Sequence, residues 1–265
     1  MLRTKIDQIH GIGIRIHKGN KSKVKGCDIS HCVTAGIEVI SADPYILMNN
    51  IRQNAENGIV TIAKNYLRCD STIKMNYIEK NKDNGILCAG ANNFTRIEKN
   101  PSISTNRKAG VKSFECSTIS IIKNKIFGNF AQGVLLVEGT SAHIEKNEIY
   151  TNFKANIAFG GEGSSDTVIF NNDIFSSRAE GIFVIESGFS WIKNNRIHDN
   201  NDGITMFDSS PHIVDNFINE NQRSGILAGG CSFPRIEKNS IFGNTTSGII
   251  VRDQAQAIIV NNKVR

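Results

Sequence analysis

Acidic side chains are the first groups in this chain that could do chemistry. Asp199, Asp202 and Asp208 lie close together in the sequence, and a pair of carboxylates can serve as general acid and base on a glycosidic bond. Sugar cleavage needs two or three carboxylates converging on one face, or a carboxylate-bound metal beside an Arg or Lys. No repeated position of the chain supplies either set. The sequence therefore predicts no catalytic residue and no enzymatic activity.

Metal-binding side chains also lack a recognisable spacing. The six histidines include neither a pair placed four residues apart, as in zincins, nor a Cys-x-x-Cys partner. The segment 160–166, Gly-Gly-Glu-Gly-Ser-Ser-Asp, is similar to a calcium-binding turn, but its Asp stands one place late and the segment occurs once. We predict neither a metal site nor a cofactor.

Asparagine dominates two positions of a repeat of roughly 23 residues that runs through the chain. The first column contains Asn49, Asn76, Asn100, Asn124, Asn147, Asn172, Asn195, Asn216, Asn239 and Asn262, with Cys27 at its start. The second column contains Asn54, Asn81, Asn106, Asn129, Asn152, Asn200, Asn221 and Asn244, with Cys32 and Ser177 at two places. A repeated Asn disfavours helices, because its side chain competes for backbone hydrogen bonds. Stacked strands instead align such side chains into an amide ladder.

Apolar and glycine columns complete the repeat. Between the two Asn columns stands an inward apolar residue: Ile51, Ile78, Ile126, Ile149, Ile174, Ile197, Ile218 and Ile241. A third column holds Gly13, Gly36, Gly58, Gly85, Gly110, Gly133, Gly181, Gly203, Gly225 and Gly248, with Asn156 once. We expect a positive φ in this column, which both residue types accept.

This repeat predicts an all-β fold, because its strands are short and no apolar period of helical length occurs. We expect a right-handed single-stranded parallel β-helix, a solenoid of about eleven coils. One domain should cover residues 1–265, and the sequence leaves open that it is part of a longer polypeptide.

A column of aromatic and cationic side chains precedes the first Asn column by four residues. It contains Tyr45, Arg96, His143, Trp191, His212 and Arg235, and Thr72, Ser120 and Val168 interrupt it. Such a strip could bind a glycan or a phosphorylated peptide through stacking and charge. A solvent-facing column without a ligand is the alternative. Nucleic acid is the ligand we least expect, since the net charge of +6 is modest and dispersed.

The strand after each Gly is apolar at the positions that alternation would leave polar. These positions are Val60, Leu87, Leu135, Val137, Phe183, Ile185, Phe207, Leu227 and Ile250. A strand that is apolar on both faces is normally covered on both faces. We therefore predict that this apolar strip binds other proteins, in a multi-subunit assembly.

Composition sets the expected cellular context. The chain has no apolar run long enough to span a membrane and no leader at its start. Its six Cys are expected to be buried free thiols, which favour a reducing compartment. We expect a cytoplasmic protein, in a cytoskeletal or other large assembly, without membrane insertion.

The run GVLLVEGTSAHIEKNEIY, with NDIF, NNRIHDN and NSIFGN further on, resembles the β-helix repeat region of F-box proteins. It is also similar to the repeat of carbohydrate-binding and sugar-hydrolase-type β-helix proteins. The chain departs from the F-box family in lacking a helical F-box segment and a Cys/His-rich zinc module. The sequence favours a non-catalytic rigid scaffold or protein-interaction module. The resemblances leave two alternatives, a carbohydrate-active lyase, hydrolase or epimerase and the substrate-recognition region of an F-box-type ubiquitin ligase.

Overall fold

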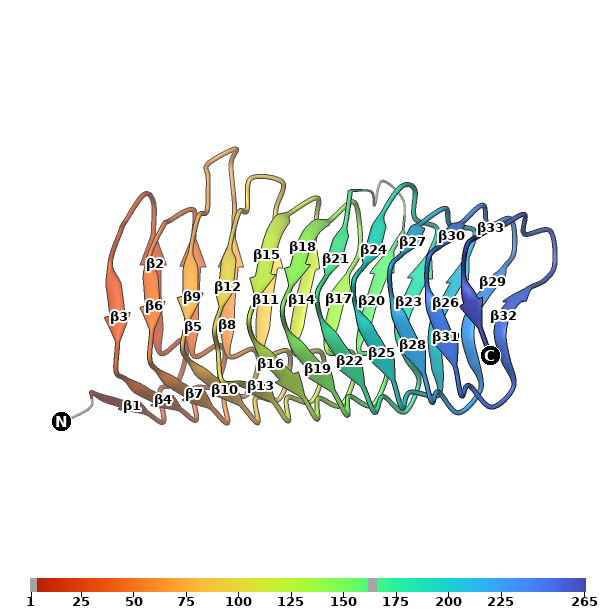
Figure 1. Ribbon diagram of the computed structural model, residues 1–265. Helices are drawn as coiled ribbons and strands as arrows, with labels where there is room; N and C mark the ends of the chain where they lie inside the picture. Colours follow the sequence, from red (N-terminus) through yellow and green to blue (C-terminus); the bar gives the residue numbers. More distant parts are fainter. Residues whose placement is uncertain (1–3, 162–165) are drawn as a thin grey trace.

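The computed structural model describes residues 4–161 and 166–265 and shows three parallel sheets wound around one elongated core (Figure 1). The 12-stranded sheet A is ordered β1 (Lys5–Asp7), β4 (Asp28–Ser30), β7 (Asn50–Arg52), β10 (Tyr77–Glu79), β13 (Ser102–Ser104), β16 (Lys125–Phe127), β19 (Glu148–Tyr150), β22 (Asp173–Phe175), β25 (Arg196–His198), β28 (Phe217–Asn219), β31 (Ser240–Phe242) and β34 (Lys263–Val264).

The 11-stranded sheet B is ordered β2 (Ile14–His17), β5 (Ile37–Ile40), β8 (Ile59–Ile62), β11 (Ile86–Ala89), β14 (Val111–Phe114), β17 (Val134–Leu136), β20 (Ile157–Gly160), β23 (Glu180–Ile185), β26 (Asp202–Phe207), β29 (Ser224–Gly229) and β32 (Ser247–Val251). The 11-stranded sheet C is ordered β3 (Lys23–Lys25), β6 (Tyr45–Leu47), β9 (Thr72–Lys74), β12 (Arg96–Glu98), β15 (Thr118–Ile122), β18 (Ser141–Glu145), β21 (Val168–Phe170), β24 (Trp191–Lys193), β27 (His212–Val214), β30 (Arg235–Glu237) and β33 (Ile258–Val260).

Each coil contributes one strand to each sheet, so every strand pairs with the strands three places before and after it. This arrangement confirms the predicted parallel β-helix of about eleven coils. The described residues contain no helix that is long and apolar enough to cross a membrane. Side chains alternate along each short strand, so the middle residue of a sheet A strand points into the core. Ile51, Ile78 and Ile126 accordingly have no exposed surface.

The two Asn columns form amide ladders inside the turns, as predicted. In the first ladder, the Asn124 Nδ2 donates to Asn147 Oδ1 at 3.0 Å, and the Asn147 Nδ2 donates to Asn172 Oδ1 at 3.0 Å. The second ladder repeats this pattern, with Asn106 Nδ2 donating to Asn129 Oδ1 at 3.0 Å. Each buried amide thus has partners above and below, which avoids the cost of an unpaired polar group.

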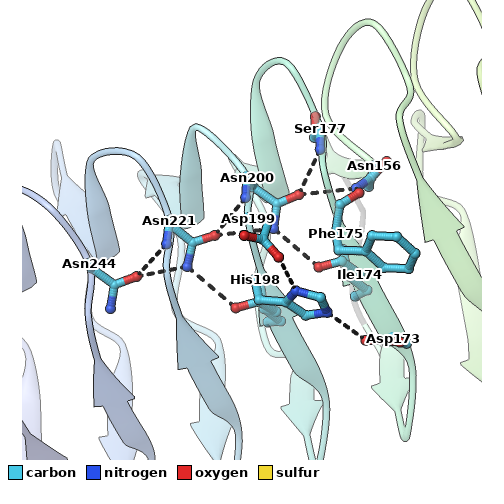
Figure 2. A network of polar contacts seen from close by, with 11 residues as sticks. Asn156, Asp173, Ile174, Phe175, Ser177, His198, Asp199, Asn200, Asn221 and Asn244 are labelled. Carbon is cyan, nitrogen blue, oxygen red and sulfur yellow. Dashed lines mark hydrogen bonds and ion pairs between the residues drawn. The ribbon is translucent and has the colours of Figure 1, made fainter.

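In the second ladder, one missing amide is replaced by an Asn from another column. Ser177 has no amide to offer, and Asn156 of the preceding coil reaches into its place (Figure 2). Asn152 Nδ2 donates to Asn156 Oδ1 at 2.8 Å, and Asn156 Nδ2 donates to Asn200 Oδ1 at 3.2 Å. The two departures from the repeat, at 156 and at 177, therefore compensate each other.

The glycine column serves a different purpose from the one predicted. Neither these glycines nor Asn156 has a positive φ. A Cβ added at Gly110 would instead lie 2.7 Å from the Gly133 carbonyl oxygen and 2.8 Å from Asn129 Nδ2. Glycine is needed because neighbouring coils approach closely, and the left-handed backbone falls on the turn residues that follow the strands, such as Lys80 and Asp199.

All six Cys are free, but they are not all buried. Cys27, Cys32, Cys69 and Cys88 are buried as predicted, and burial raises the pKa of the Cys88 thiol to about 12. The prediction is wrong for two others, Cys116 and Cys231, which lie at exposed turns after sheet B strands.

Candidate functional site

The predicted apolar strip lies on the outer face of sheet B. Strand pairing places Val60 beside Leu87 and Phe183 beside Thr205, which in turn pairs with Leu227. The strip is not continuous, because Lys112 separates Leu87 from Leu135 and Ala158 separates Leu135 from Phe183. Val60 and Leu227 are covered by their neighbours and are only 6% and 5% exposed.

The middle of this strip forms an apolar cleft of about 630 Å³. Its lining includes Leu135, Val137, Phe183 and Ile185, and the small residue Ala158 lies between the first and second pairs. Four of the nine strip residues thus line one cleft, and Phe207 packs beside it with its ring centroid 6.4 Å from that of Phe183. Their role in protein binding stays a prediction.

The predicted ligand strip lies on the outer face of sheet C, where strand pairing aligns its members along consecutive coils. Trp191 contacts His212 with ring centroids 4.3 Å apart. The two arginines and His143 already have partners on the protein: Arg96 pairs with Asp70 at 2.9 Å, His143 contacts Glu145 at 2.9 Å, and Arg235 pairs with Glu237 at 2.6 Å. Arg235 lowers the pKa of Glu237 through this contact. The strip therefore carries less free charge than its sequence suggests, and its ligand stays a prediction.

The carboxylates named in the sequence do not meet as a set. Asp202 is buried, accepts the Ser224 backbone N–H at 3.0 Å and lies 3.4 Å from Arg223. Asp208, in the turn after β26, accepts the Cys231 backbone N–H at 2.7 Å. Asp202 thus joins the starts of β26 and β29, and Asp208 holds the turn after β29.

Asp199 instead belongs to a cluster with His198 and Asp173 on the outer face of sheet A (Figure 2). The His198 Nδ1 lies 2.6 Å from Asp199 Oδ2, and its Nε2 lies 3.0 Å from Asp173 Oδ1. Asp199 has a φ of 54° in the turn after β25, where Asp tolerates the left-handed backbone. This turn brings its carboxylate back to the imidazole. Both carboxylates are accessible, at 52% and 38% of their side-chain surface.

A stack of aromatic side chains holds the His198 ring in place. The last residues of four successive sheet A strands are Phe127, Tyr150, Phe175 and His198. Their ring centroids lie 4.9, 4.8 and 5.1 Å apart, and neighbouring rings are within 8° of parallel. This spacing matches the distance between strands in a sheet, so the fold itself stacks the rings. His198 is only 7% exposed and has little freedom to rotate.

Polar groups surround this stack. Arg196 pairs in register with Asp173 and is exposed. At the other end of the stack, Lys125 of β16 and Glu148 of β19 form an ion pair of 2.8 Å beside Tyr150, and the contact raises the pKa of Lys125. Burial raises the pKa of Tyr150, against the opposing influence of Lys125. The phenol therefore stays neutral at physiological pH.

On the far side of His198, Asn219 contributes an unpaired acceptor. It stands in register with His198, is 4% exposed, and its Oδ1 has no hydrogen-bond partner among the described residues. An unpaired buried oxygen costs free energy.

The His198 cluster was missed in the sequence because its members come from two coils. Asp173 is 25 residues from His198, a separation without meaning until the coil length is known. The available signal was the column one place after the inward Ile, which reads Phe127, Tyr150, Phe175, His198. No group of three or more His, Cys, Asp or Glu within residues 4–161 and 166–265 is arranged to hold a metal ion. Residues 162–165 of the segment similar to a calcium-binding turn lie outside the described residues.

Several solved structures share this fold. The chain is similar to the periplasmic alginate epimerase AlgG, with a TM-score of 0.66, 10% identity, and coverage of 95% of this chain and 76% of that one. It is also similar to the A-module of the Azotobacter vinelandii mannuronan C-5 epimerase AlgE4, with a TM-score of 0.71, 15% identity, and coverage of 98% and 84%. For pectate lyase Pel9A the TM-score is 0.55, the identity 11%, and the coverage 87% and 68%. No curated protein sequence matches the chain.

These similarities correct the functional prediction. The sequence predicted no enzymatic activity, but the similar structures are epimerases and a lyase. They support neither the non-catalytic scaffold nor the F-box resemblance. A family model described as the right-handed β-helix region matches residues 1–101, 96–189 and 161–265. The chain therefore belongs to the right-handed β-helix family.

Proposed function

We propose that the chain is a carbohydrate-active enzyme that transfers protons on a polysaccharide at the cluster of Asp173, His198 and Asp199. The observation that carries the proposal is the imidazole held between two accessible carboxylates, at 2.6 and 3.0 Å. Histidine and carboxylates are the usual general acids and bases of enzymes. The alginate epimerases and the pectate lyase with the same fold support a polysaccharide substrate.

The geometry favours proton abstraction over hydrolysis. Hydrolysis requires two carboxylates facing each other across the sugar, with a gap of about 5 to 9.5 Å. Here the His198 ring itself fills the space between Asp173 and Asp199. A sugar must therefore approach the cluster from outside, where it meets the carboxylate of Asp199 and the guanidinium of Arg196.

The proposed step begins with Asp199, which takes a proton from the ring carbon that bears the sugar's carboxyl group. Arg196 stabilises the negative charge that develops on that carboxyl group. His198 stabilises the second carboxylate, that of Asp173, through its contact at 3.0 Å. For epimerisation, a proton from water adds to the opposite face of the carbon. For elimination, the electron pair forms a double bond and expels the glycosidic oxygen, which takes a proton from water. In both cases Asp199 then releases its proton to solvent.

Incubation with alginate and with pectate tests this proposal. Proton NMR would detect epimerised sugars, and ultraviolet absorbance would detect unsaturated products. We expect turnover of at least one polymer by the parent, and a loss of roughly 100-fold or more in the variants His198→Gln and Asp199→Asn. The control Asp215→Asn changes an exposed acid with a similar φ of 55° in another turn and should keep activity.

Circular dichroism should show that each variant keeps the β-helix. The proposal fails if the folded parent turns over neither polymer, or if His198→Gln is as active as the parent.

A further inference from the structure

A cleft of about 460 Å³ lies at the corner between sheets A and B, several coils from the His198 cluster. Three cations line it: Lys80 and Lys82 from the turn after β10, and Arg107 from the turn after β13. Phe130 of the next coil, 62% exposed, also lines the cleft. All three cationic side chains are exposed.

The charge of this cleft is not neutralised by the protein. None of the three cations forms an ion pair with a described residue, whereas Lys108 beside them pairs with Asp83 at 2.9 Å. Asp83, which follows Lys82 in the sequence, is thus paired with Lys108 and not with Lys82. His31, a further lining residue, is held by Asp7 at 2.8 Å. The cleft therefore presents three free positive charges around a small volume, which favours a ligand with several negative groups.

The cleft and the His198 cluster lie along one edge of the solenoid. Lys80 and Asp199 occupy the same turn position in their coils, and both have a positive φ. Their strands, β10 and β25, are five coils apart in sheet A, which corresponds to about 24 Å. No single sugar spans this distance, whereas a polymer lying along the edge would.

The turns between the two sites offer contacts for sugar rings. Phe130 and Phe153 occupy the same place in adjacent coils, where their backbone N–H groups donate to the backbone carbonyl oxygens of Asn106 and Asn129. Phe153 is 52% exposed, and the Arg178 guanidinium lies 5.1 Å from its ring. Exposed aromatic faces bind the apolar faces of sugars, and a guanidinium beside them binds anionic substituents.

We propose that the cleft of Lys80, Lys82 and Arg107 is a remote subsite for an anionic polysaccharide, whose chain runs past Phe130 and Phe153 to the His198 cluster. This inference rests on the proposed function, because the cluster supplies the reacting end of the track. Carboxylated and sulfated glycans share the required chemistry. The three cations bind the chain without taking part in the reaction.

Equilibrium binding tests the subsite separately from catalysis. Isothermal titration calorimetry at low salt would use pectate, alginate, a sulfated glycan and a neutral glucan as probes. The variant Lys80→Gln/Lys82→Gln/Arg107→Gln should bind the preferred anionic glycan roughly tenfold more weakly than the parent. The control Lys21→Gln/Lys23→Gln/Lys25→Gln removes the same charge from exposed lysines near the start of the chain and should bind as the parent does.

The outcomes separate the two proposals. Unchanged binding by the cleft variant, or equal binding of the neutral glucan by the parent, would refute the subsite even if the enzyme turns over polysaccharide. Weaker binding by the cleft variant without any turnover by the parent would leave the subsite standing and remove the proposed function. If a single-stranded oligonucleotide binds the parent more tightly than every glycan, the assignment to a polysaccharide is wrong.

Discussion

At the residue scale, a side-chain contact was predictable wherever it joins residues at the equivalent position of adjacent coils. The Asn ladders belong to this class, because one column of the sequence becomes one column in space. Asn156 and Ser177 do not, since each departs from its own column and the two meet only in the folded chain. For the same reason the His198 cluster escaped prediction, because Asp173 and Asp199 come from different columns.

The repair of the second ladder predicts strong coupling between positions 156 and 177. Asn156→Gly should destabilise the fold by about 1 to 3 kcal/mol, because Asn152 and Asn200 lose their shared partner. Ser177→Asn should also destabilise it, because the new amide would compete with Asn156 for one space. The double variant restores the usual pattern of the repeat and should recover most of the lost stability.

Urea unfolding of the four proteins measures this coupling as a double-mutant cycle. The two single changes should not add, and the interaction free energy should favour the double variant. Additive effects would mean that Asn156 does not fill the place of the missing amide.

At the element scale, the strands were predictable because each one follows the same three-residue pattern in every coil. A sheet A strand consists of an inward Ile and two outward neighbours, and the flanking turns force the chain to change direction. The purpose of the glycine column was predicted wrongly. Sequence shows that a small residue is required, but only the spacing of adjacent coils shows that the reason is contact with the Gly carbonyl of the next coil.

The close approach of coils predicts that Gly110→Ala is costly. Its Cβ would meet the Gly133 carbonyl oxygen and Ile126 Cγ2, each at 2.7 Å, and both belong to the packed core of the next coil. We expect a loss of about 1 to 3 kcal/mol, typical of overpacking. The control is Gly11→Ala, whose Cβ would meet nothing within 4 Å. Its free energy of unfolding should stay within about 0.5 kcal/mol of the parent.

Urea unfolding of the two alanine variants measures this difference as a shift of the midpoint, provided that the m-value is the same in both. Equal midpoints would contradict the explanation by close approach.

At the scale of the whole molecule, residues at the same position of successive coils lie in a straight row along the solenoid. About eleven coils form a rod of roughly 50 Å, and each coil adds one turn residue to the edge that carries both proposed sites. A rigid edge of this kind positions a polymer without any domain movement. The rate of turnover should therefore depend on the length of the substrate, because the two sites lie a fixed distance apart.

For oligosaccharides of an anionic polymer that the protein turns over, kcat/KM should rise with chain length and level off once the chain reaches the basic cleft, about 24 Å from the His198 cluster. Contacts at the remote end help to hold the reacting sugar in place, so longer chains should react faster at low concentration. The triple variant at Lys80, Lys82 and Arg107 should level off at a shorter length, roughly tenfold lower in kcat/KM for the longest chains. Steady-state kinetics over a length series measures both effects. Equal kcat/KM for short and long chains, or the same length dependence in the variant as in the parent, would show that the substrate does not follow this edge.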